Sequence, residues 1–330
     1  MAQVIDNAKG FKVIEMSLPE SVKAFGGVGV CDSCGRAAYT AYYIATLNEA
    51  FCPYCYEEWQ KLAERYEEDA AIEQHNFEKH ATHKMKLTIL GSSSAGNCYL
   101  LDNGKESLLV ECGLSYKSIT KVRDFDARRV KGCIISHEHG DHVKGSVKVL
   151  EACIPCYMSA GTAKALGLED NHLVTTVQPM KPYRLGGFTV QGFDVQHDAA
   201  EPLGYLIHHK EIGTTLFATD TYYLKYKFAG LSNILIECNY RHDILEDNVA
   251  AGVVSKAQYN RTIKSHMSLE TCKEVLLAND LSAVNNIVLI HLSPTNSHAK
   301  DFQQSIKELT GKNVVIAEAG LTMDFDKSPF

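Results

Sequence analysis

Long hydrophobic segments are missing from this sequence of 330 residues. No apolar run approaches the roughly 18 residues that a membrane-spanning helix needs. Residues 1–20 mix Asp, Lys and Glu with the apolar positions, and they lack the apolar core and the small-residue cleavage site of a secretory signal. We therefore expect no membrane association and a cytoplasmic protein.

An excess of positive charge is also missing. Lys and Arg total 33 against 40 Asp and Glu, which gives a formal net charge of -7 at pH 7. Such a chain has no general attraction to nucleic acid, so any binding of nucleic acid would need a local basic patch. Six basic residues are candidates for a basic groove, or else for an ordinary solvated face: Lys121, Arg123, Arg128, Arg129, Lys131 and Lys144.

Disulfide bonds are not expected, although the chain has 11 cysteines, because nothing in the sequence indicates an oxidising compartment. Five cysteines have apolar neighbours and are predicted to be buried thiols. They are Cys98, Cys112, Cys133, Cys238 and Cys272.

Two further pairs of cysteines are different, because each has C-x2-C spacing. Cys31 and Cys34 form one pair, Cys52 and Cys55 form the other, and 17 residues separate the pairs. This spacing is typical of a structural zinc site with four thiolates, which leaves the ion no open coordination position. The alternative is four unrelated buried cysteines. The pattern predicts a small zinc module of the zinc-ribbon or treble-clef-like type.

A domain boundary is predicted near Lys84, so that residues 1–84 form the zinc module and residues 85–330 form a second domain. Residues 56–83 have helical periodicity, with Trp59, Leu62, Tyr66 and Ile72 as the expected apolar stripe. Residues 1–84 carry 8 basic and 13 acidic groups, which is the wrong charge for phosphate contact. We expect this module to mediate a protein interaction or homodimerisation, or to act as a stabilising cap.

From residue 85 the pattern changes to short buried strands, followed by an alternation of strands and helices. This order predicts an α/β domain with two sheets and helices outside. The expected strands are 85–90, 98–101, 107–111, 132–136, 155–159, 188–195, 204–208, 214–219, 233–237, 286–291 and 313–317. The expected helices are 144–152, 162–166, 269–279, with Ser268 as its cap, and 299–309.

Four potential metal ligands occur within six residues at the end of the expected strand 132–136. They are His137, His139, Asp141 and His142. Imidazole and carboxylate groups are the ligands that hold zinc or manganese in hydrolytic sites. Because α/β sheets place their sites at the carboxyl ends of strands, the position also fits. A solvated polar loop is the alternative.

This H-x-H-x-D-H pattern resembles the signature of the metallo-β-lactamase superfamily, in particular its YycJ/WalJ-like branch, which is related to ribonuclease Z. Five more segments resemble family motifs in the family's order: 91–97, 196–205, 217–221, 265–268 and 290–293. The resemblance covers residues 85–330 and not residues 1–84. It implies the αββα sandwich of that family.

Carried over position by position, the resemblance implies two catalytic zinc or manganese ions. His137, His139 and His197 would hold one ion, Asp141, His142 and His291 the other, and Asp220 would bridge both. A hydroxide shared by the two ions would be the nucleophile. Asp141 could also orient it, and His266 would protonate the leaving oxygen. Asn97 and Ser268 are expected to donate hydrogen bonds to phosphate oxygens.

The family usually has Asp where this chain has Glu111, a position that steadies the metal loop and does not ligate. Segment 293–296 also departs from the branch's usual sequence, which leaves the substrate more open than the catalysis. Relatives in this branch are phosphodiesterases, and the resemblance implies a nuclease, expected to be an exonuclease by analogy with them.

Three other functions stay open at this point. A small-molecule phosphodiesterase acting on cyclic nucleotides would use the same metals and would need no basic groove. A hydrolase of esters, thioesters or lactones is a more distant alternative. A binding protein without turnover would fit the fold, but the complete ligand set argues against it. We do not expect a β-lactam substrate, because the chain lacks an export signal.

Overall fold

The computed structural model describes residues 3–16, 31–36, 41–47, 49–82, 85–122 and 125–327. The chain divides into two compact units. The first comprises Met1–Lys84 with two short later segments, Ser282–Asn285 and Asp326–Phe330, and the second comprises Met85–Leu281 and Asn286–Phe325. None of the helices in these described ranges combines the length and the apolar character that a membrane span requires.

The described part of the first unit is an antiparallel sheet in the order β1-β2-β3-β4, together with two helices. Its elements are β1 (Gln3–Asp6), β2 (Lys12–Met16), β3 (Ala41–Ile44), β4 (Glu49–Phe51), α2 (Pro53–Leu62) and α3 (Glu67–Thr82). A small core forms where Phe11, Val13 and Ile44 pack with Trp59 and the cysteines. Such a small core fits a module that a bound metal ion stabilises further.

The predicted continuous helix over residues 56–83 is interrupted. Helix α2 ends where Ala63 takes an extended conformation, and α3 begins at Glu67. The predicted apolar stripe is also wrong, because Leu62 is 82% exposed and Tyr66 is 61% exposed. Buried Glu73 anchors α3 instead, through hydrogen bonds from Arg65 and from the backbone N–H of Lys12. A periodicity of apolar residues cannot reveal such a polar anchor.

The second unit has two stacked sheets, each with seven strands among the described residues. The first sheet runs in the order β10 (Val174–Thr176), β9 (Cys156–Met158), β8 (Val130–Ile134), β7 (Ser107–Val110), β6 (Cys98–Asp102), β5 (Lys86–Gly91) and β18 (Thr322–Asp324). The second runs in the order β11 (Pro182–Leu185), β12 (Phe188–Asp194), β13 (Leu203–His209), β14 (Gly213–Ala218), β15 (Leu231–Glu237), β16 (Asn286–Ile290) and β17 (Asn313–Ile316).

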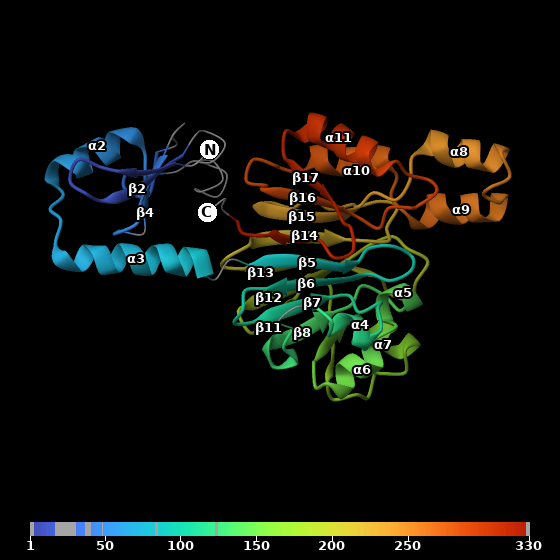
Figure 1. The fold of residues 1–330 in the computed structure, drawn as a ribbon. Coiled ribbons are helices and arrows are strands. Elements are labelled where there is room, and N and C mark those ends of the chain that lie inside the picture. The colour runs from blue at the N-terminus through green and yellow to red at the C-terminus, as the bar shows by residue number, and fades with distance from the viewer. Residues whose placement is uncertain are drawn as a thin grey trace. The chain divides into compact units, whose positions relative to one another are not determined.

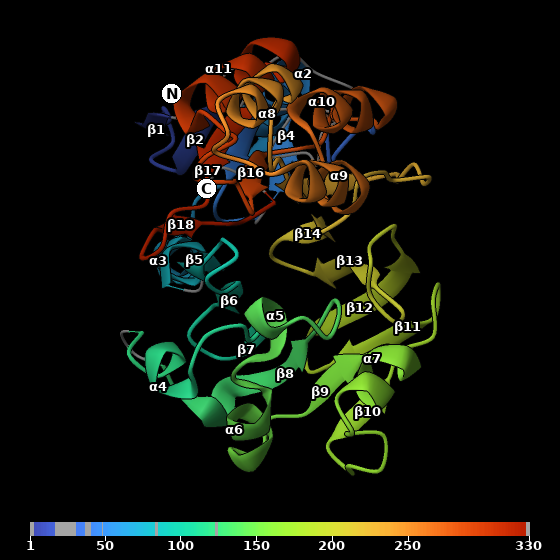
Figure 2. The same cartoon turned by 90° about the vertical axis from the view of Figure 1, so that its right-hand side faces the viewer.

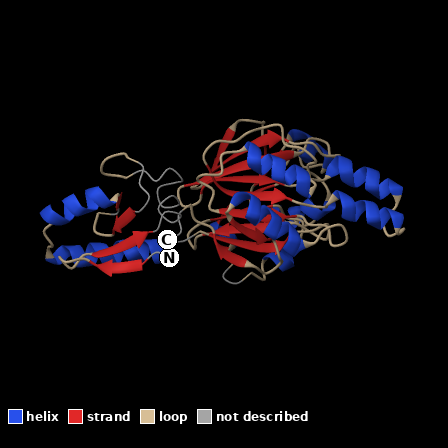
Figure 3. Ribbon diagram, turned by 90° about the horizontal axis from the view of Figure 1, so that it is seen from above, coloured by secondary structure: helices blue, strands red, loops and turns tan. Residues whose placement is uncertain are grey.

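Helices cover the outer faces of this pair of sheets, as Figures 1 and 3 show. Beside the first sheet are α4 (Tyr116–Ile119), η1 (Ala127–Arg129), α5 (Gly140–Val143), α6 (Ser146–Glu151) and α7 (Ala160–Ala165). The chain segments that connect strands of the second sheet contain α8 (His242–Ala250), α9 (Lys256–Ser265), α10 (Leu269–Ala278) and α11 (Ala299–Thr310). The predicted αββα sandwich is therefore confirmed.

The main core lies between the two sheets. Leu87 and Tyr99 of the first sheet pack in one buried cluster with Tyr205, Phe217 and Val288 of the second. Burying each such side chain stabilises the fold by about 1.5–3 kcal/mol. A second cluster fills the space between the first sheet and its helices. All five cysteines that were predicted to be core thiols have exposures of 0%: Cys98, Cys112, Cys133, Cys238 and Cys272.

Parallel strands bring several carboxyl ends to one edge of the sandwich. Strand β7 is parallel to β8 in one sheet, and β14, β15 and β16 are mutually parallel in the other. Three non-glycine residues one or two positions after these strands have positive φ angles: Glu111 (64°), Asp220 (45°) and His291 (54°). This left-handed conformation costs about 1–3 kcal/mol per residue and turns each chain abruptly at the sheet edge.

The helical pair α8 and α9 was not predicted from the sequence. Figure 1 shows these helices projecting beyond the ends of the strands, so in Figure 2 they face the viewer. Few residues of the pair are buried, with Leu245 the buried residue of α8 and Ser265 that of α9. The available signals were the capping box that Ser255 and Gln258 form at the start of α9, and a short apolar pattern in each helix, with Val249 of α8 and Tyr259 and Ile263 of α9 packing near Leu245. The four helices that were predicted correspond to α6, α7, α10 and α11.

Candidate metal centre and active site

The loop after β8 carries the dense ligand cluster of the sequence, and neighbouring loops fix its backbone. The N–H of Asn97 donates to the carbonyl of Asp141 (2.7 Å), and the N–H of Cys112 donates to that of His142 (2.9 Å). A Cβ atom at Gly113 would lie 1.7 Å from the carbonyl oxygen of Asp141. Only glycine therefore permits this close approach, which holds the ligand loop against β7.

One group of ligand atoms comes from three histidines and a carboxylate. His139 Nδ1 lies 3.1 Å from His137 Nε2 and 3.1 Å from His197 Nε2. The carboxylate of Asp220 lies 3.5 Å from His137 Nε2 and 3.7 Å from His197 Nε2. Zinc–nitrogen bonds of about 2.05 Å in a tetrahedron place two ligand nitrogens about 3.3 Å apart. The spacing of the imidazole nitrogens fits a shared cation.

A second group shares the carboxylate of Asp220 with the first. Its Oδ2 lies 3.0 Å from His142 Nε2, and its Oδ1 lies 3.2 Å from His291 Nδ1. Asp141 Oδ2 is 3.5 Å from His142 Nε2 and 3.6 Å from His291 Nε2. Within each of the two groups, all ligand atoms lie within 4.8 Å of one another, and Asp220 belongs to both. The predicted seven ligand side chains are thus brought together.

Outer contacts orient the histidine rings. His137 Nδ1 lies 2.8 Å from the hydroxyl of Ser136, and His197 Nδ1 donates to the carbonyl of Ser265 (2.9 Å). Buried Glu111 accepts from the N–H of Ser136 and lies 3.3 Å from His142 Nδ1. These contacts leave the Nε2 atoms of the three rings for a metal. The longer side chain of Glu111 still reaches the metal loop and does not join the ligand groups.

The buried polar atoms of the site fit divalent cations. His291 Nε2 is buried and has no hydrogen-bond partner among the described residues. Burial lowers the pKa of His137 well below its usual range, which keeps this imidazole neutral as a ligand requires. Burial opposes protonation of His291 as well, but Asp220, Asp141 and Glu237 raise its pKa to about 10. The carboxylates therefore favour a positive charge at this position, and a metal ion can replace the proton.

His266 stands beside the two ligand groups at the end of α9. Its Nδ1 donates to Glu237 Oε1 at 2.7 Å, and its ring stacks on that of His291. Burial lowers the pKa of His266, but the charge and hydrogen bond of Glu237 and the charge of Asp220 together outweigh burial and raise the pKa. Its side chain is 18% exposed and lines the pocket. A protonated imidazole at this position can act as a proton donor.

Glu237 is the functional residue that the sequence did not indicate. It ends β15, is fully buried, and accepts four N–H groups. Oε1 accepts from His266 and lies 3.2 Å from His291 Nδ1, and Oε2 accepts from the backbone N–H groups of Thr221 (3.0 Å) and Met267 (3.1 Å). The available signal was a lone carboxylate at the end of an otherwise apolar strand.

The expected phosphate contacts from Asn97 and Ser268 need correction. Asn97 is 0% exposed, and its side-chain amide lies 3.1 Å from His142 Nε2, so it supports a ligand and does not face the pocket. Ser268 is 1% exposed, and its hydroxyl caps α10 by accepting from the N–H of Thr271. Ser residues serve both roles in proteins, and the sequence pattern alone could not separate them.

The predicted basic groove does not line the pocket. Arg128, Arg129 and Lys131 lie at the beginning of β8, at the opposite end of the strand from His137. Arg128 is paired with Asp126, and Arg129 donates to the carbonyl of Gly104. Lys121 and Lys144 are also not among the described pocket-lining residues, and Arg123 lies outside the described residues.

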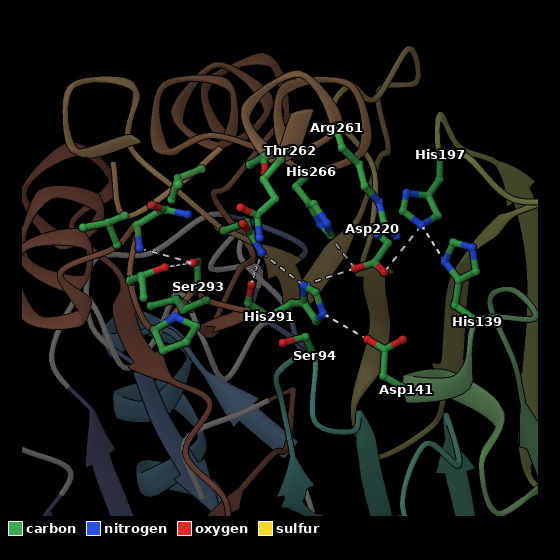
Figure 4. Close-up of a pocket in the computed structure, with 18 residues that line it drawn as sticks. Ser94, His139, Asp141, His197, Asp220, Arg261, Thr262, His266, His291 and Ser293 are labelled. Carbon is green, nitrogen blue, oxygen red and sulfur yellow. Dashed lines mark hydrogen bonds and ion pairs between the residues drawn. The ribbon is translucent and has the colours of Figure 1, made fainter. Parts of the chain in front are cut away.

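The open side of the metal centre is a cavity of about 530 Å³. Figure 4 shows Asp141, His139 and His197 at one end, with Asp220, His291 and His266 between them and α9. Helix α9 contributes Gln258, Arg261 and Thr262, and the loop after β16 contributes residues 292–296. A volume of this size is typical of sites for small ligands or parts of larger ones, at about 300–1,000 Å³.

The four cysteines predicted to hold zinc also come together, in the first unit. Their sulfur atoms all lie within 4.8 Å of one another, and Cys34 Sγ lies 3.9 Å from Cys52 Sγ. Zinc–sulfur bonds of about 2.3 Å in a tetrahedron separate two sulfurs by about 3.8 Å. Gly35, with a φ of 68°, turns the first C-x2-C hairpin. The arrangement supports a small zinc module.

Comparison with known protein sequences finds a matching family and named relatives. The sequence profile of the metallo-beta-lactamase superfamily matches residues 93–230. The chain is 30% identical over 270 residues to "Exodeoxyribonuclease WalJ" of Streptococcus pneumoniae serotype 2, which covers 74% of this chain and 94% of the relative. It is 26% identical over 260 residues to "Exodeoxyribonuclease YycJ" of Bacillus anthracis, with 73% and 96% covered.

Solved structures resemble this fold at low sequence identity. The metallo-beta-lactamase fold protein YhfI of Bacillus subtilis has a TM-score of 0.55 at 20% identity, covering 73% of this chain and 99% of that protein. The short form of human tRNase Z has a TM-score of 0.50 at 15% identity, with 73% and 99% covered. The profile match, the identity to WalJ and the αββα sandwich with its divalent-metal ligands agree, and the chain belongs to the metallo-beta-lactamase superfamily.

Proposed function

We propose that this protein is a metal-dependent phosphodiesterase that acts on nucleic acid, with exonuclease action as the first expectation. The observation that carries the proposal is the position of Asp220 between two complete groups of ligand atoms, with His266 beside them. The WalJ and YycJ relatives are named exodeoxyribonucleases, which supports DNA as the substrate. Two zinc or manganese ions in these groups, and a zinc ion at the four cysteines, are part of the proposal.

His137, His139 and His197 would hold one ion, and Asp141, His142 and His291 the other, with Asp220 shared. When bound, such a pair supplies a nucleophile at neutral pH and neutralises charge on the phosphate. The chain's own groups do the remaining work. Glu237 holds His266 through Nδ1, so that Nε2 can give a proton to the leaving oxygen. Asp141 faces the cavity and can orient the attacking group.

Two tyrosines support a substrate with nucleobases. Tyr222 and Tyr223 follow Asp220 almost directly, and they are 42% and 51% exposed. Neither is among the described pocket-lining residues, but exposed aromatic side chains this near to Asp220 in the chain can stack on bases of a strand that extends beyond the pocket, at about 1–3 kcal/mol for each base. They provide a sequence-tolerant contact that does not depend on a basic groove.

A small-molecule phosphodiesterase remains the second candidate, because a cavity of about 530 Å³ could also hold one cyclic nucleotide. Hydrolysis of esters, thioesters or lactones is the more distant alternative. The role of residues 1–84 in a protein interaction or in homodimerisation stays a prediction.

The test is a substrate panel with purified protein loaded with zinc or with manganese. The panel contains single-stranded and duplex DNA labelled at either end, RNA, cyclic nucleotides and bis-(p-nitrophenyl) phosphate. We expect stepwise release of nucleotides from DNA, abolished in Asp220→Ala and retained in Asp301→Ala, a matched change at an exposed aspartate on α11. Turnover of cyclic nucleotides and the simple diester without DNA cleavage would reject the nuclease assignment.

A further inference from the structure

Helix α9 presents one polar face to the cavity. Gln258, Arg261 and Thr262 are spaced by three and four residues, so they lie on the same side of the helix, and all three line the cavity. Arg261 is the one lysine or arginine among the described residues that do so. The other formal charges there, apart from the histidines, are the carboxylates of Asp141 and Asp220.

A carboxylate outside the metal ligands holds Arg261 in this place. Arg261 Nε lies 3.5 Å from Asp198 Oδ2. The other oxygen of Asp198 accepts from the hydroxyl of Ser265 (2.9 Å) and lies 3.4 Å from His197 Nδ1. Asp198 is therefore the anchor of Arg261, and the Ser265 hydroxyl fixes its position.

The position of the anchor places Arg261 to one side of the metal centre. The Nε2 atom of His197 faces His139 and Asp220, whereas its Nδ1 atom faces Asp198. Asp198 and the guanidinium that it holds are thus on the outer side of the His197 ring from the ligand groups. Figure 4 shows Arg261 reaching from α9 toward the side of the pocket where His197 and His266 lie.

The guanidinium has donors to offer a ligand. The contact with Asp198 is at Nε, 3.5 Å from the carboxylate, and the two terminal nitrogens remain as the pair of N–H groups that can face a ligand. The side chain is 65% exposed, so a ligand can reach it. A guanidinium binds phosphate oxygens through two parallel N–H groups and carries its charge at all relevant pH values.

We propose that Arg261 binds a phosphate of the substrate next to the one that reacts, and so makes the site selective for a chain of phosphodiesters. This inference rests on the proposed nucleic-acid phosphodiesterase function and names a specificity-determining residue for it. The reacting phosphate belongs at the metal ligands, and a nucleic acid strand carries its next phosphate one nucleotide away. A substrate with a single phosphate has nothing to place beside Arg261.

The test compares kcat/KM for a single-stranded DNA oligonucleotide with that for bis-(p-nitrophenyl) phosphate in the full-length, metal-loaded protein. We expect Arg261→Ala to lower the ratio of the two values by ~10- to 100-fold, the usual effect of losing one charge-assisted hydrogen bond. Arg261→Lys should give an intermediate ratio, because it keeps the charge and loses the planar pair of donors. Lys264→Ala removes the same charge from an exposed position of α9 and should leave the ratio unchanged.

A second arm locates the phosphate and does not depend on turnover. Binding of labelled oligonucleotides is measured by fluorescence anisotropy in the Asp141→Ala background, with one linkage at a time replaced by an uncharged methylphosphonate. One linkage should weaken binding with Arg261 present and have little effect with Arg261→Ala. The slope of log K against log salt should also fall by about 0.7, the value for one phosphate of a single strand.

Two failures can be told apart. An unchanged ratio, or an equal loss on both substrates, would overturn the role of Arg261 while leaving the nuclease assignment intact. A wild-type protein that turns over the simple diester and cleaves no oligonucleotide would overturn the proposed function, and the inference with it. An oligonucleotide series in which every linkage has the same effect with and without Arg261 would also refute the contact.

Discussion

Glu237→Gln is the substitution that best tests how the site positions its proton donor. Glu237 accepts two N–H groups at each carboxylate oxygen: backbone N–H groups at Oε2, and the imidazoles of His266 and His291 at Oε1. Glutamine has the same shape but only one accepting atom. Whichever way its amide turns, an NH2 group faces two donors, so a nearly isosteric change loses hydrogen bonds that a carboxylate makes.

The expected loss follows from these contacts. A hydrogen bond to a charged group contributes about 1.5–3 kcal/mol. If the whole of the contact with His266 is felt when the leaving group departs, kcat falls by ~10- to 150-fold, since each 1.4 kcal/mol is tenfold. His266→Ala removes the proton donor itself and should cost ~10²- to 10⁴-fold. KM for bis-(p-nitrophenyl) phosphate should change much less than kcat in both variants.

The measurement is a double-mutant cycle on kcat, with metal content and thermal unfolding recorded for every variant. In the His266→Ala background, Glu237→Gln should cost little more, because the group that it positions is gone. If the two losses simply add, Glu237 acts independently of His266 and the positioning role is refuted. Loss of bound metal in Glu237→Gln alone would instead assign its effect to His291, which lies 3.2 Å from the same oxygen.

Three other changes test separate parts of the structure. Cys34→Ser should remove one equivalent of zinc, measured by elemental analysis, and leave the other metal ions bound; a full zinc complement would contradict the four-sulfur site. Ser268→Ala should lower the free energy of unfolding by about 1 kcal/mol through loss of the α10 cap, with KM unchanged; a raised KM without destabilisation would restore its role as a phosphate contact. Replacing either Tyr222 or Tyr223 by alanine should raise KM for single-stranded DNA by ~5- to 150-fold, because stacking on a base contributes about 1–3 kcal/mol, and an equal rise for bis-(p-nitrophenyl) phosphate would exclude base stacking as the cause.

The clustering of the seven proposed ligand side chains could be predicted from the sequence because part of it is concentrated in one segment. Four ligands within residues 137–142 already indicate a metal site, and the strand pattern places them at the end of β8. The more distant ligands, such as His197 and His291, were identified through the resemblance to the family and not through periodicity. The structure then shows Asp220 between both groups, a relation that depends on the parallel pairing of strands far apart in the sequence.

The rest depended on side-chain environment, which a single sequence does not reveal. Glu237 is one acidic residue among many, and its importance comes from four donors supplied by other segments. Arg261 belongs to a helix with little buried surface, whose only apolar pattern among the described residues is the pair Tyr259 and Ile263, a weak signal for a helix. Asn97 was expected to touch substrate, and its burial beneath the ligand loop follows from the backbone pairing with Asp141.

The three left-handed turns at Glu111, Asp220 and His291 set stability against function. Glycine would adopt each turn at no steric cost, but it offers neither carboxylate nor imidazole. Selection for heat resistance alone is therefore expected to favour glycine or asparagine at these three positions. Such variants would lose metal binding before they lose the fold. A more stable variant should therefore keep these three positions unchanged and carry its stabilising substitutions in loops at the opposite edge of the sandwich.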